Sequence, residues 1–397
     1  MTDAEQLSRN VTSEAPSADE PRSARQSPVE AGASTLVAML LDNHHGPDFR
    51  IEFETGLLAE AGIATRVVAW DRRPEPSGEE PESGAEVVRI NVPAPSGGGR
   101  RTFMAMLQFG RHVWARRGEL FAGVSVLIVH DLYLLPLGWA LSRKLGLPFV
   151  YDAHEEYALM EAERYPRWFL RLVTGIESRL ARSATAIVVP GTSRLRRWNG
   201  VVRRQPLVLS NLVGRDQTPD TTQALEWDLL YVGTVSSVRR PDLLIELARR
   251  RPDLRIGIAG RGRSTGAVEA AANELPNLTY LGWRRDAGAL FPRTRAIYYG
   301  LDPNHAYSDA ACPNTLYHAL RNRRPLIFFC GGEMGQLASE FKIGIRCEAS
   351  AAELERAVDE VGKIDDWQFD EAWHAVWERG DTRAFVEAVQ AAASRRG

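Results

Sequence analysis

The chain has 397 residues, of which 44% are hydrophobic, and this length favours two folded domains of ordinary size over a single one. Its 49 basic and 51 acidic residues give a net charge of −2, which argues against nucleic acid as the main partner. The three cysteines have no metal-ligand spacing, and neither an apolar run of about 18 residues nor a signal peptide is found, so a cytoplasmic protein is expected.

Residues 1–33 are rich in serine, proline, acidic residues and alanine, and a disordered tail is predicted there. The first domain is expected over residues 34–212. Its first strand, residues 35–41, is a continuous apolar run, as in a strand buried on both faces of a parallel sheet. Further strands are predicted at residues 64–70, 85–92, 124–129, 148–151, 185–189 and 206–209, with helices at residues 49–60, 102–117, 134–145 and 165–182.

The helix at residues 102–117 combines large apolar side chains with arginines, among them Phe103, Met104 and Arg111. Such a basic amphipathic helix could lie on membrane lipid, which would place the protein at the inner face of the membrane. It could equally pack into the core of the first domain. Both interpretations stay open at this point.

A polar linker is expected at residues 213–226, after which the strand and helix pattern restarts. The second domain, residues 227–365, is predicted to hold strands at residues 229–233, 254–259, 279–282, 296–300, 326–329 and 343–347. Helices are predicted at residues 242–250 and 286–291, from Pro313, and from Ala351 to the end. The fold class is therefore α/β, with two doubly wound Rossmann-like domains facing a cleft.

The helix beginning at Pro313 offers free backbone N–H groups and the positive end of its dipole, and Arg323 and Arg324 follow it. This combination could hold the phosphates of a nucleotide. An ordinary helix-to-strand unit with solvated arginines is the alternative.

Four local patterns resemble the GT-B-fold glycosyltransferases, and within them the retaining family 4. They are Pro47-Asp48-Phe49-Arg50, then Tyr151-Asp152-Ala153-His154-Glu155, then Tyr231-Val232-Gly233 with Arg239-Arg240 and Gly260-Arg261-Gly262, and finally Pro313-Asn314 with Ala319 and Arg324-Pro325. The resemblance covers the chain from about Thr35 to its end. It implies that the helices of residues 366–397 cross back to the first domain.

The resemblance assigns roles to these residues. It implies that His154 and Glu155 are catalytic, by orienting the acceptor or stabilising charge near the anomeric carbon. Polar residues near the carboxyl ends of the first strands are expected on the acceptor side: Asp48, Arg50, His130 and Asp131. The resemblance implies that the nucleotide-sugar donor contacts Gly233, Arg239, Arg240, Gly260, Arg261, Pro313, Asn314, Thr315 and His318, with no metal and no separate cofactor.

The sequence departs from the family pattern at the donor site. Thr315 stands where the family usually has lysine, and His318 stands where it has the glutamate that binds the donor ribose. Ala310 replaces an acidic partner, and Arg239 replaces the usual phosphate-binding lysine. His318 can still form a hydrogen bond with a ribose hydroxyl, and Arg239 can still bind phosphate.

The leading hypothesis is a retaining, metal-independent glycosyltransferase that moves a sugar from a nucleoside diphosphate to a glycan or a lipid-linked acceptor. Two alternatives stay open. One is a nucleotide-sugar 2-epimerase on the same fold, which would convert the donor with no acceptor present. The other is a catalytically degenerate protein that binds sugar nucleotides without turnover.

Overall fold

The computed structural model describes residues 35–43, 48–74, 84–95, 99–202, 204–212, 223–284 and 286–395. The predicted tail, and most of the predicted linker, lie outside the described residues. In the part that is described, no helix is both long enough and apolar enough to cross a membrane.

The first sheet contains seven parallel strands in the order β3-β2-β1-β4-β5-β6-β7. The chain changes direction across this sheet between β1 and β4, which is where ligands bind in folds of this kind. The strands are β1 (Leu36–Leu41), β2 (Ala64–Asp71), β3 (Glu86–Asn91), β4 (Val126–His130), β5 (Phe149–Asp152), β6 (Ala186–Val189) and β7 (Leu207–Val208). The helices of this half are α1 (Phe49–Glu60), α2 (Arg100–Ala115), α3 (Arg117–Leu120), α4 (Asp131–Leu145), α5 (Tyr157–Met160), α6 (Arg167–Ala181) and α7 (Leu195–Trp198), with a 3-10 turn η1 (Thr192–Arg194).

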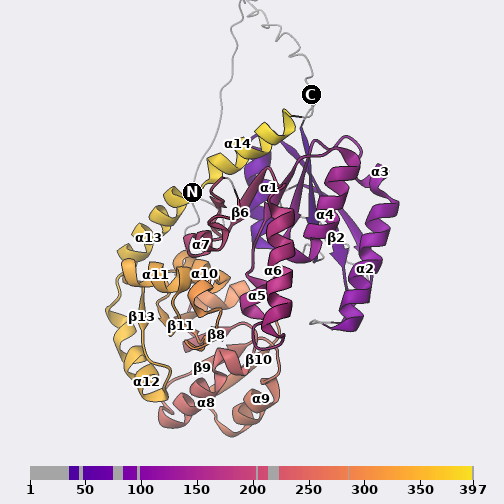
Figure 1. Cartoon of the computed structure of the whole chain (residues 1–397). Coiled ribbons are helices and arrows are strands. Elements are labelled where there is room, and N and C mark those ends of the chain that lie inside the picture. Colours follow the sequence, from indigo (N-terminus) through magenta and orange to yellow (C-terminus); the bar gives the residue numbers. More distant parts are fainter. Residues whose placement is uncertain are drawn as a thin grey trace, which may run out of the picture. The chain divides into compact units, whose positions relative to one another are not determined.

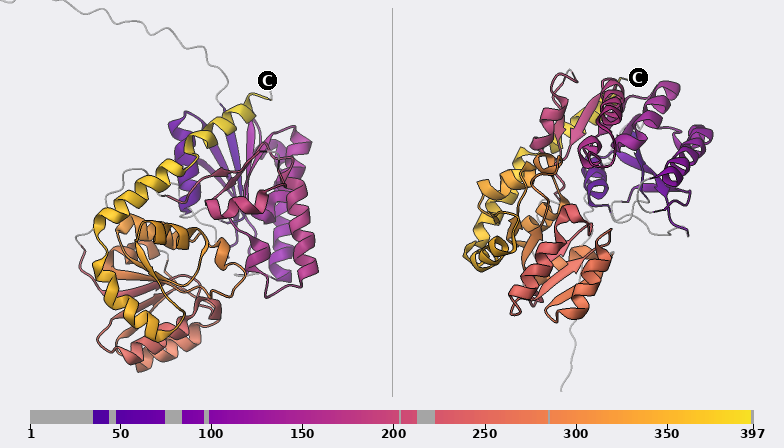
Figure 2. Two further views of the ribbon diagram at one scale, coloured as in Figure 1. Left: turned by 60° about the vertical axis from the view of Figure 1, so that its left-hand side comes forward. Right: turned by 60° about the horizontal axis from the view of Figure 1, so that its bottom comes forward.

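Both faces of the first sheet are buried, and the side chains of successive β1 residues lie on opposite faces. Ala38 and Leu40 pack in the cluster that includes α2, α4 and α6. Val37 and Met39 pack on the other side, against α1 and a helix from the end of the chain. Because alternate residues of β1 are buried on opposite faces of the sheet, every position of the strand is apolar. Figure 2 shows α2, α4 and α6 gathered on one side of the first sheet.

The second sheet contains six parallel strands in the order β10-β9-β8-β11-β12-β13. They are β8 (Trp227–Val232), β9 (Ile256–Ala259), β10 (Leu278–Gly282), β11 (Thr294–Tyr299), β12 (Leu326–Phe328) and β13 (Gly344–Arg346). Its helices are α8 (Pro241–Arg250), α9 (Thr265–Glu274), α10 (Asn314–Asn322), α11 (Gly332–Glu340) and α12 (Ala351–Glu360), with 3-10 turns η2 (Ser237–Arg239), η3 (Ala287–Arg293), η4 (Ser308–Ala310) and η5 (Val361–Lys363).

The last two helices pack on different sheets (Figure 1, yellow). In α13 (Asp366–Arg379), Phe369 and Trp373 join the core of the second half. In α14 (Thr382–Ala393), Phe385 and Val389 join the core of the first half. Between the two helices, Asp381 anchors the chain to β7, because its N–H donates to the Val208 carbonyl and its carboxylate accepts from the Val208 N–H, both at 2.7 Å.

The predicted fold class, two parallel Rossmann-like sheets, is confirmed. The four-residue helices α5 and α7 were not predicted, and neither were the longer helices α9 and α11. The segments of α9 and α11 are rich in alanine and glycine and carry few large apolar side chains, so the helical period is weak. The predicted helix at residues 102–117 is in fact two helices, because the chain leaves helical geometry at Arg116.

Candidate active site

The carboxyl ends of β4 and β5 bring a set of charged side chains together. His130 and Asp152 are paired in register as the last residues of these neighbouring strands. Both side chains are almost fully buried, and so is Glu54 on the second turn of α1. Buried ionisable groups are rare unless they are paired, so this cluster marks a candidate site.

Arg50, in the first turn of α1, is the positive centre of the cluster. Its Nε and Nη2 donate to the two oxygens of Asp152 at 2.7 and 2.6 Å. Its Nη1 donates to the Leu209 carbonyl at 2.7 Å and to Asn211 Oδ1 at 2.8 Å. Its Nε also lies 3.1 Å from Glu54 Oε1. Arg50 was predicted on the acceptor side, and it lies in this cluster with its donors engaged by the protein.

Asp48, also predicted on the acceptor side, caps α1. Its Oδ1 accepts from the N–H groups of Arg50 and Ile51 at 3.2 and 3.4 Å, and its Oδ2 accepts from Asn43 Nδ2 at 2.9 Å. This capping fixes the first turn of the helix, and therefore the backbone position of Arg50.

The two histidines meet at one oxygen of Asp152. His154 Nε2 lies 2.5 Å from Asp152 Oδ2, and His130 Nδ1 lies 3.2 Å from the same atom. The second nitrogen of His154 lies 3.6 Å from Asp131 Oδ2, and that of His130 lies 3.7 Å from Glu54 Oε2. His154 and Asp131 keep some exposure, 19% and 14% of their side chains, so they form the solvent-facing edge of the cluster.

Burial and neighbouring charges set the protonation of this cluster. Burial acts to raise the pKa of Asp152, but Arg50 and His154 hold it well below its usual range. Burial acts to lower the pKa of His154, but Asp152 and Asp131 raise it, so this imidazole carries a proton up to a higher pH than usual. Burial lowers the pKa of His130, which stays neutral.

Two carboxyl groups of the cluster are shifted toward the neutral form. Burial and the charge of Asp152 raise the pKa of Glu54 well above its usual range. Neither Glu54 oxygen has a donor in hydrogen-bond geometry, which agrees with a protonated carboxyl that donates to Asp152. Burial raises the pKa of Asp131 to about 7, against the opposing effect of His154.

Four of these residues have the ligand types of a metal site. Atoms of Glu54, His130, Asp152 and His154 lie within 4.8 Å of one another. However, the guanidinium of Arg50 already contacts both carboxylates, and it supplies the positive charge that an ion would bring. The donor set therefore fits a metal ion poorly while Arg50 is in place.

Glu155 has other partners than His154, and it connects the two halves of the chain. Its Oε2 accepts from Arg194 Nη2 at 3.1 Å and from the Tyr307 hydroxyl at 2.6 Å. The Arg194 side chain is 1% exposed, and it also donates to the carbonyls of His154 and Ala310 at 2.5 and 3.1 Å. The two residues predicted to be catalytic are thus adjacent in sequence but belong to different clusters.

The predicted donor glycines lie where two loops of the second sheet touch. A Cβ on Gly260, whose φ is +138°, would lie 1.8 Å from the carbonyl oxygen of Gly233. A Cβ on Gly262 would lie 2.2 Å from the carbonyl oxygen of Val235. Only glycine fits at these two positions, and the loops after β8 and β9 therefore run backbone against backbone.

The three predicted donor arginines have different surroundings. Arg239 Nη1 donates to the Tyr299 hydroxyl at 2.5 Å, and its guanidinium lies 4.9 Å from the centre of that ring. Arg240 pairs with Asp242 at 2.8 Å, at the start of α8. Arg261 lies 5.3 Å from the centre of the Trp283 ring. Arg239 is the most buried of the three, and burial opposes its charge while Tyr299 raises its pKa.

The predicted helix start near Pro313 is present, with Pro313 as the residue before α10. Asn314 Oδ1 accepts from Asn211 Nδ2 at 2.7 Å, so this helix start touches the loop after β7, while Thr315 is half-buried. His318 stacks on Phe291, with ring centres 4.4 Å apart and an angle of 11°. Burial, and then Arg321, lower the pKa of His318 to about 4, so the ring is neutral near pH 7.

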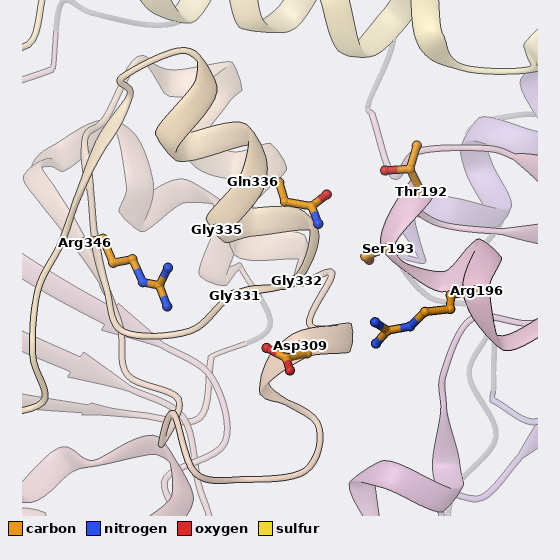
Figure 3. A pocket seen from close by; sticks show the side chains of 9 residues that line it. All are labelled: Thr192, Ser193, Arg196, Asp309, Gly331, Gly332, Gly335, Gln336 and Arg346. Carbon is orange, nitrogen blue, oxygen red and sulfur yellow. The ribbon is translucent and has the colours of Figure 1, made fainter.

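A pocket of about 460 Å³ is lined by the nine residues that are labelled in Figure 3. Arg196 of α7 faces it from one side, and Gln336 of α11 and Arg346 of β13 face it from the other. None of the residues predicted from the sequence lines it. The remaining lining residues are Thr192, Ser193, Asp309, Gly331, Gly332 and Gly335.

Several residues of the candidate site were not predicted. Asp152 belongs to the Tyr151-Asp152-Ala153-His154-Glu155 pattern, but no role was predicted for it. Its position at the end of a buried strand was a usable signal. Glu54 lies four residues after Arg50, on the same helix face, and that spacing was a usable signal. Arg194, Tyr299 and Tyr307 gave none, because their contacts join segments far apart in sequence.

The first half of the chain matches a known sequence family. Residues 55–211 match the family described as glycosyl transferase 4-like domain. No curated protein matches the chain by sequence.

Solved structures match over nearly the whole chain. Sucrose-phosphate synthase from Thermosynechococcus elongatus is 14% identical with a TM-score of 0.67, and the match covers 91% of this chain and 97% of that one. Anabaena HepE, in complex with UDP and glucose, is 12% identical with a TM-score of 0.64, covering 90% and 99%. The lipopolysaccharide outer core galactosyltransferase WaaB is 12% identical with a TM-score of 0.56, covering 91% and 100%. The chain thus has the GT-B fold of glycosyltransferases and resembles family 4 of these enzymes.

Proposed function

We propose that the chain is a retaining, metal-independent glycosyltransferase that transfers a sugar from a nucleoside diphosphate to a glycan or a lipid-linked acceptor. HepE, which has the same fold, has been solved with UDP, with UDP-glucose, and with UDP and glucose. These complexes support a nucleoside diphosphate sugar as the donor here.

The proposal rests on the contacts by which Arg194 and Glu155 connect the loop after β5, in the first half of the chain, to Tyr307 in the second half. The Arg194 guanidinium donates hydrogen bonds to the His154 carbonyl in the first half of the chain and to the Tyr307 hydroxyl in the second half. Arg239 lies on Tyr299, close enough to Tyr307 for that hydroxyl to affect its pKa. A donor phosphate on Arg239 would therefore face an acceptor held near His154.

The chemistry needs positive charge for the phosphate and a proton acceptor for the incoming hydroxyl. The bond between the anomeric carbon and the diphosphate breaks, and its electron pair stays on the phosphate, which Arg239 and the N–H groups at the start of α10 stabilise. The acceptor oxygen bonds to the anomeric carbon on the same face from which the diphosphate leaves, which retains the configuration, and it loses its proton. Asp131, whose pKa burial raises to about 7, lies 3.6 Å from His154 and would take that proton.

The test is calorimetric titration of the full chain with UDP, GDP and ADP, each with and without magnesium. The proposal expects one nucleotide to bind, equally well without magnesium. The matching nucleotide sugar is then incubated with and without acceptor glycans. Transfer only when an acceptor is present supports the proposal, and conversion of the sugar without one would assign a 2-epimerase instead.

Two observations favour the degenerate binder as a second candidate. His318, at the position of the family's ribose-binding glutamate, stacks on Phe291 and is largely buried. Ala310, at the position of the acidic partner, offers only its backbone carbonyl, which accepts from Arg194. Nucleotide binding without any turnover would select this candidate, whereas no binding of any nucleotide would overturn both.

A further inference from the structure

The outer surface of α2, α4 and α6 exposes large apolar side chains. On α2, Phe103 is 55% exposed and Met104 is 62% exposed. On α6, Trp168 is 67% exposed and Leu172 is 54% exposed. The same surface also includes Leu107, Trp114, Trp139 and Ile176, each at least 37% exposed.

These helices are neighbours, so their exposed residues form one surface, which we call the α2-α4-α6 face. A Cβ on Gly110 of α2 would lie 3.9 Å from Leu137 of α4, and the inner sides of all three helices share one core cluster. Figure 2 shows the three helices together on one side of the first sheet. Apolar residues gathered in this way, rather than scattered singly, indicate an interaction surface.

Packing into the core does not account for this surface. On α2, Ala105, Phe109 and Val113 point inward at intervals of four residues and are buried. Phe103 and Leu107 lie on the opposite side of the helix, because each follows or precedes Ala105 by two residues. The helix therefore has two apolar sides, and only one of them is used in the fold. The two sequence interpretations of this helix, core packing and surface contact, are not exclusive.

The charges on the face all have one sign. Along these three helices, every residue of which is described, the exposed charged residues are Arg100, Arg101, Arg111, Arg143, Lys144, Arg167, Arg171 and Arg179. The helices contain only two acidic residues, Asp131 and Glu177, and neither is exposed. No ion pair within the described residues joins any of the eight basic side chains to a carboxylate. The whole chain has a net charge of −2, so this concentration of positive charge is local.

We propose that the α2-α4-α6 face binds the surface of a bilayer that contains anionic lipid. Arginine and lysine would reach the phosphates while their stems and the neighbouring aromatic and aliphatic side chains enter the boundary between headgroups and acyl chains. Nucleic acid would match the charge, but it would leave Phe103, Met104, Trp168 and Leu172 in water. The proposal goes beyond the transferase activity and does not depend on it.

The test is co-sedimentation of the full chain with vesicles. Vesicles of phosphatidylcholine with phosphatidylglycerol are compared with vesicles of phosphatidylcholine alone, at low salt and at about 0.5 M salt. We expect binding to the anionic vesicles at low salt, and at least about a tenfold weaker affinity at high salt or without the anionic lipid. No binding to anionic vesicles at low salt overturns the proposal.

Matched variants locate the contact. Trp168→Ser and Phe103→Ser should each weaken vesicle binding about tenfold, whereas Trp367→Ser, which alters a 61% exposed tryptophan on α13, should leave it unchanged. Arg111→Glu/Arg171→Glu should abolish binding, whereas Arg249→Glu/Arg250→Glu on α8 should not. Because all these positions are exposed, unchanged circular dichroism spectra are expected. Equal loss in the control variants would overturn the proposal.

Two further measurements separate this proposal from its competitors. Binding of a DNA duplex that the Arg111→Glu/Arg171→Glu variant loses, together with no vesicle binding, would assign the face to nucleic acid. Calorimetric titration of the Trp168→Ser variant with nucleotides should match the wild type. A failure of the proposed donor site would thus be seen independently of lipid binding.

Discussion

Arg50 and Asp152 form a two-point ion pair that is almost completely withdrawn from water. Two guanidinium nitrogens donate to the two carboxylate oxygens at 2.7 and 2.6 Å, and the two side chains are 4% and 0% exposed. The same carboxylate accepts from His154 at 2.5 Å. Asp152 is therefore shared between a structural arginine and the histidine that faces solvent, so the geometry of the candidate site depends on α1.

Removing Arg50 should destabilise the fold strongly. Arg50→Ala leaves Asp152 buried without its arginine partner, and the unfolding free energy measured by urea denaturation should fall by about 3–5 kcal/mol. Arg50→Lys keeps the charge but loses the two-point geometry, so an intermediate loss is expected. Arg383→Ala, at a 92% exposed arginine of α14, is the control and should change little. An equally small effect of Arg50→Ala would show that the pair contributes nothing to stability.

The dependence of stability on pH should reveal Asp131. Its pKa is about 7 in the fold against an ordinary 3.8, so between these values the folded state holds more protons than the unfolded state. The contribution of Asp131 to stability therefore decreases as the pH rises through this interval. The raised pKa of His154 acts in the same direction above pH 6.5, whereas the lowered pKa of His130 opposes it.

Asp131→Asn removes this titration and also one of the two carboxylates that raise the pKa of His154, and both changes act in the same direction. The stability of the variant relative to the wild type should increase from about pH 5 to about pH 8, measured by urea denaturation at each pH. Glu246→Gln, at an exposed carboxylate of α8, should show no such trend. A relative stability that stays flat or falls with pH would mean that Asp131 is ionised throughout this range.

Much of the fold could be predicted from the sequence because it depends on patterns along the chain. A strand such as β1, apolar at every position, implies a sheet covered on both faces, and the order of strands and helices then implies parallel pairing. The positions of His130 and Asp152 at strand ends followed from the same reasoning, since neighbouring parallel strands end at one edge. The helices α9 and α11 were missed because alanine and glycine carry little periodic signal.

The orientations of side chains at the site could not be predicted in this way. Glu155 follows His154 directly, yet its contact with Tyr307 joins residues 152 positions apart. His318 was expected to reach a ribose, but its ring lies on Phe291. Such contacts depend on the packing of segments that are distant in sequence, about which local spacing says nothing.

Nucleotide binding should depend on Arg239. If the arginine contacts the diphosphate, Arg239→Ala should weaken binding of the preferred nucleotide by about 1.5–3 kcal/mol in calorimetric titrations. Tyr299→Phe removes the hydroxyl that positions Arg239 and should cause a smaller loss. Arg249→Ala, an exposed arginine on α8, is the control. An unchanged dissociation constant in Arg239→Ala would remove this residue from the donor site.

The close contact between the loops after β8 and β9 can be tested by a substitution at Gly260. Gly260→Ala places a methyl group 1.8 Å from the Gly233 carbonyl oxygen, at a φ of +138° that alanine disfavours. One of the two loops must move, and a loss of about 3–5 kcal/mol in unfolding free energy is expected, together with weaker nucleotide binding. Gly266→Ala is the matched control, because its Cβ would have no neighbour within 4 Å and the residue lies in α9. It should stabilise the protein by about 0.5–1 kcal/mol, since alanine is the better helix former. If both variants had the same stability, the loops after β8 and β9 would not be in close contact, and a glycine at position 260 would not be required.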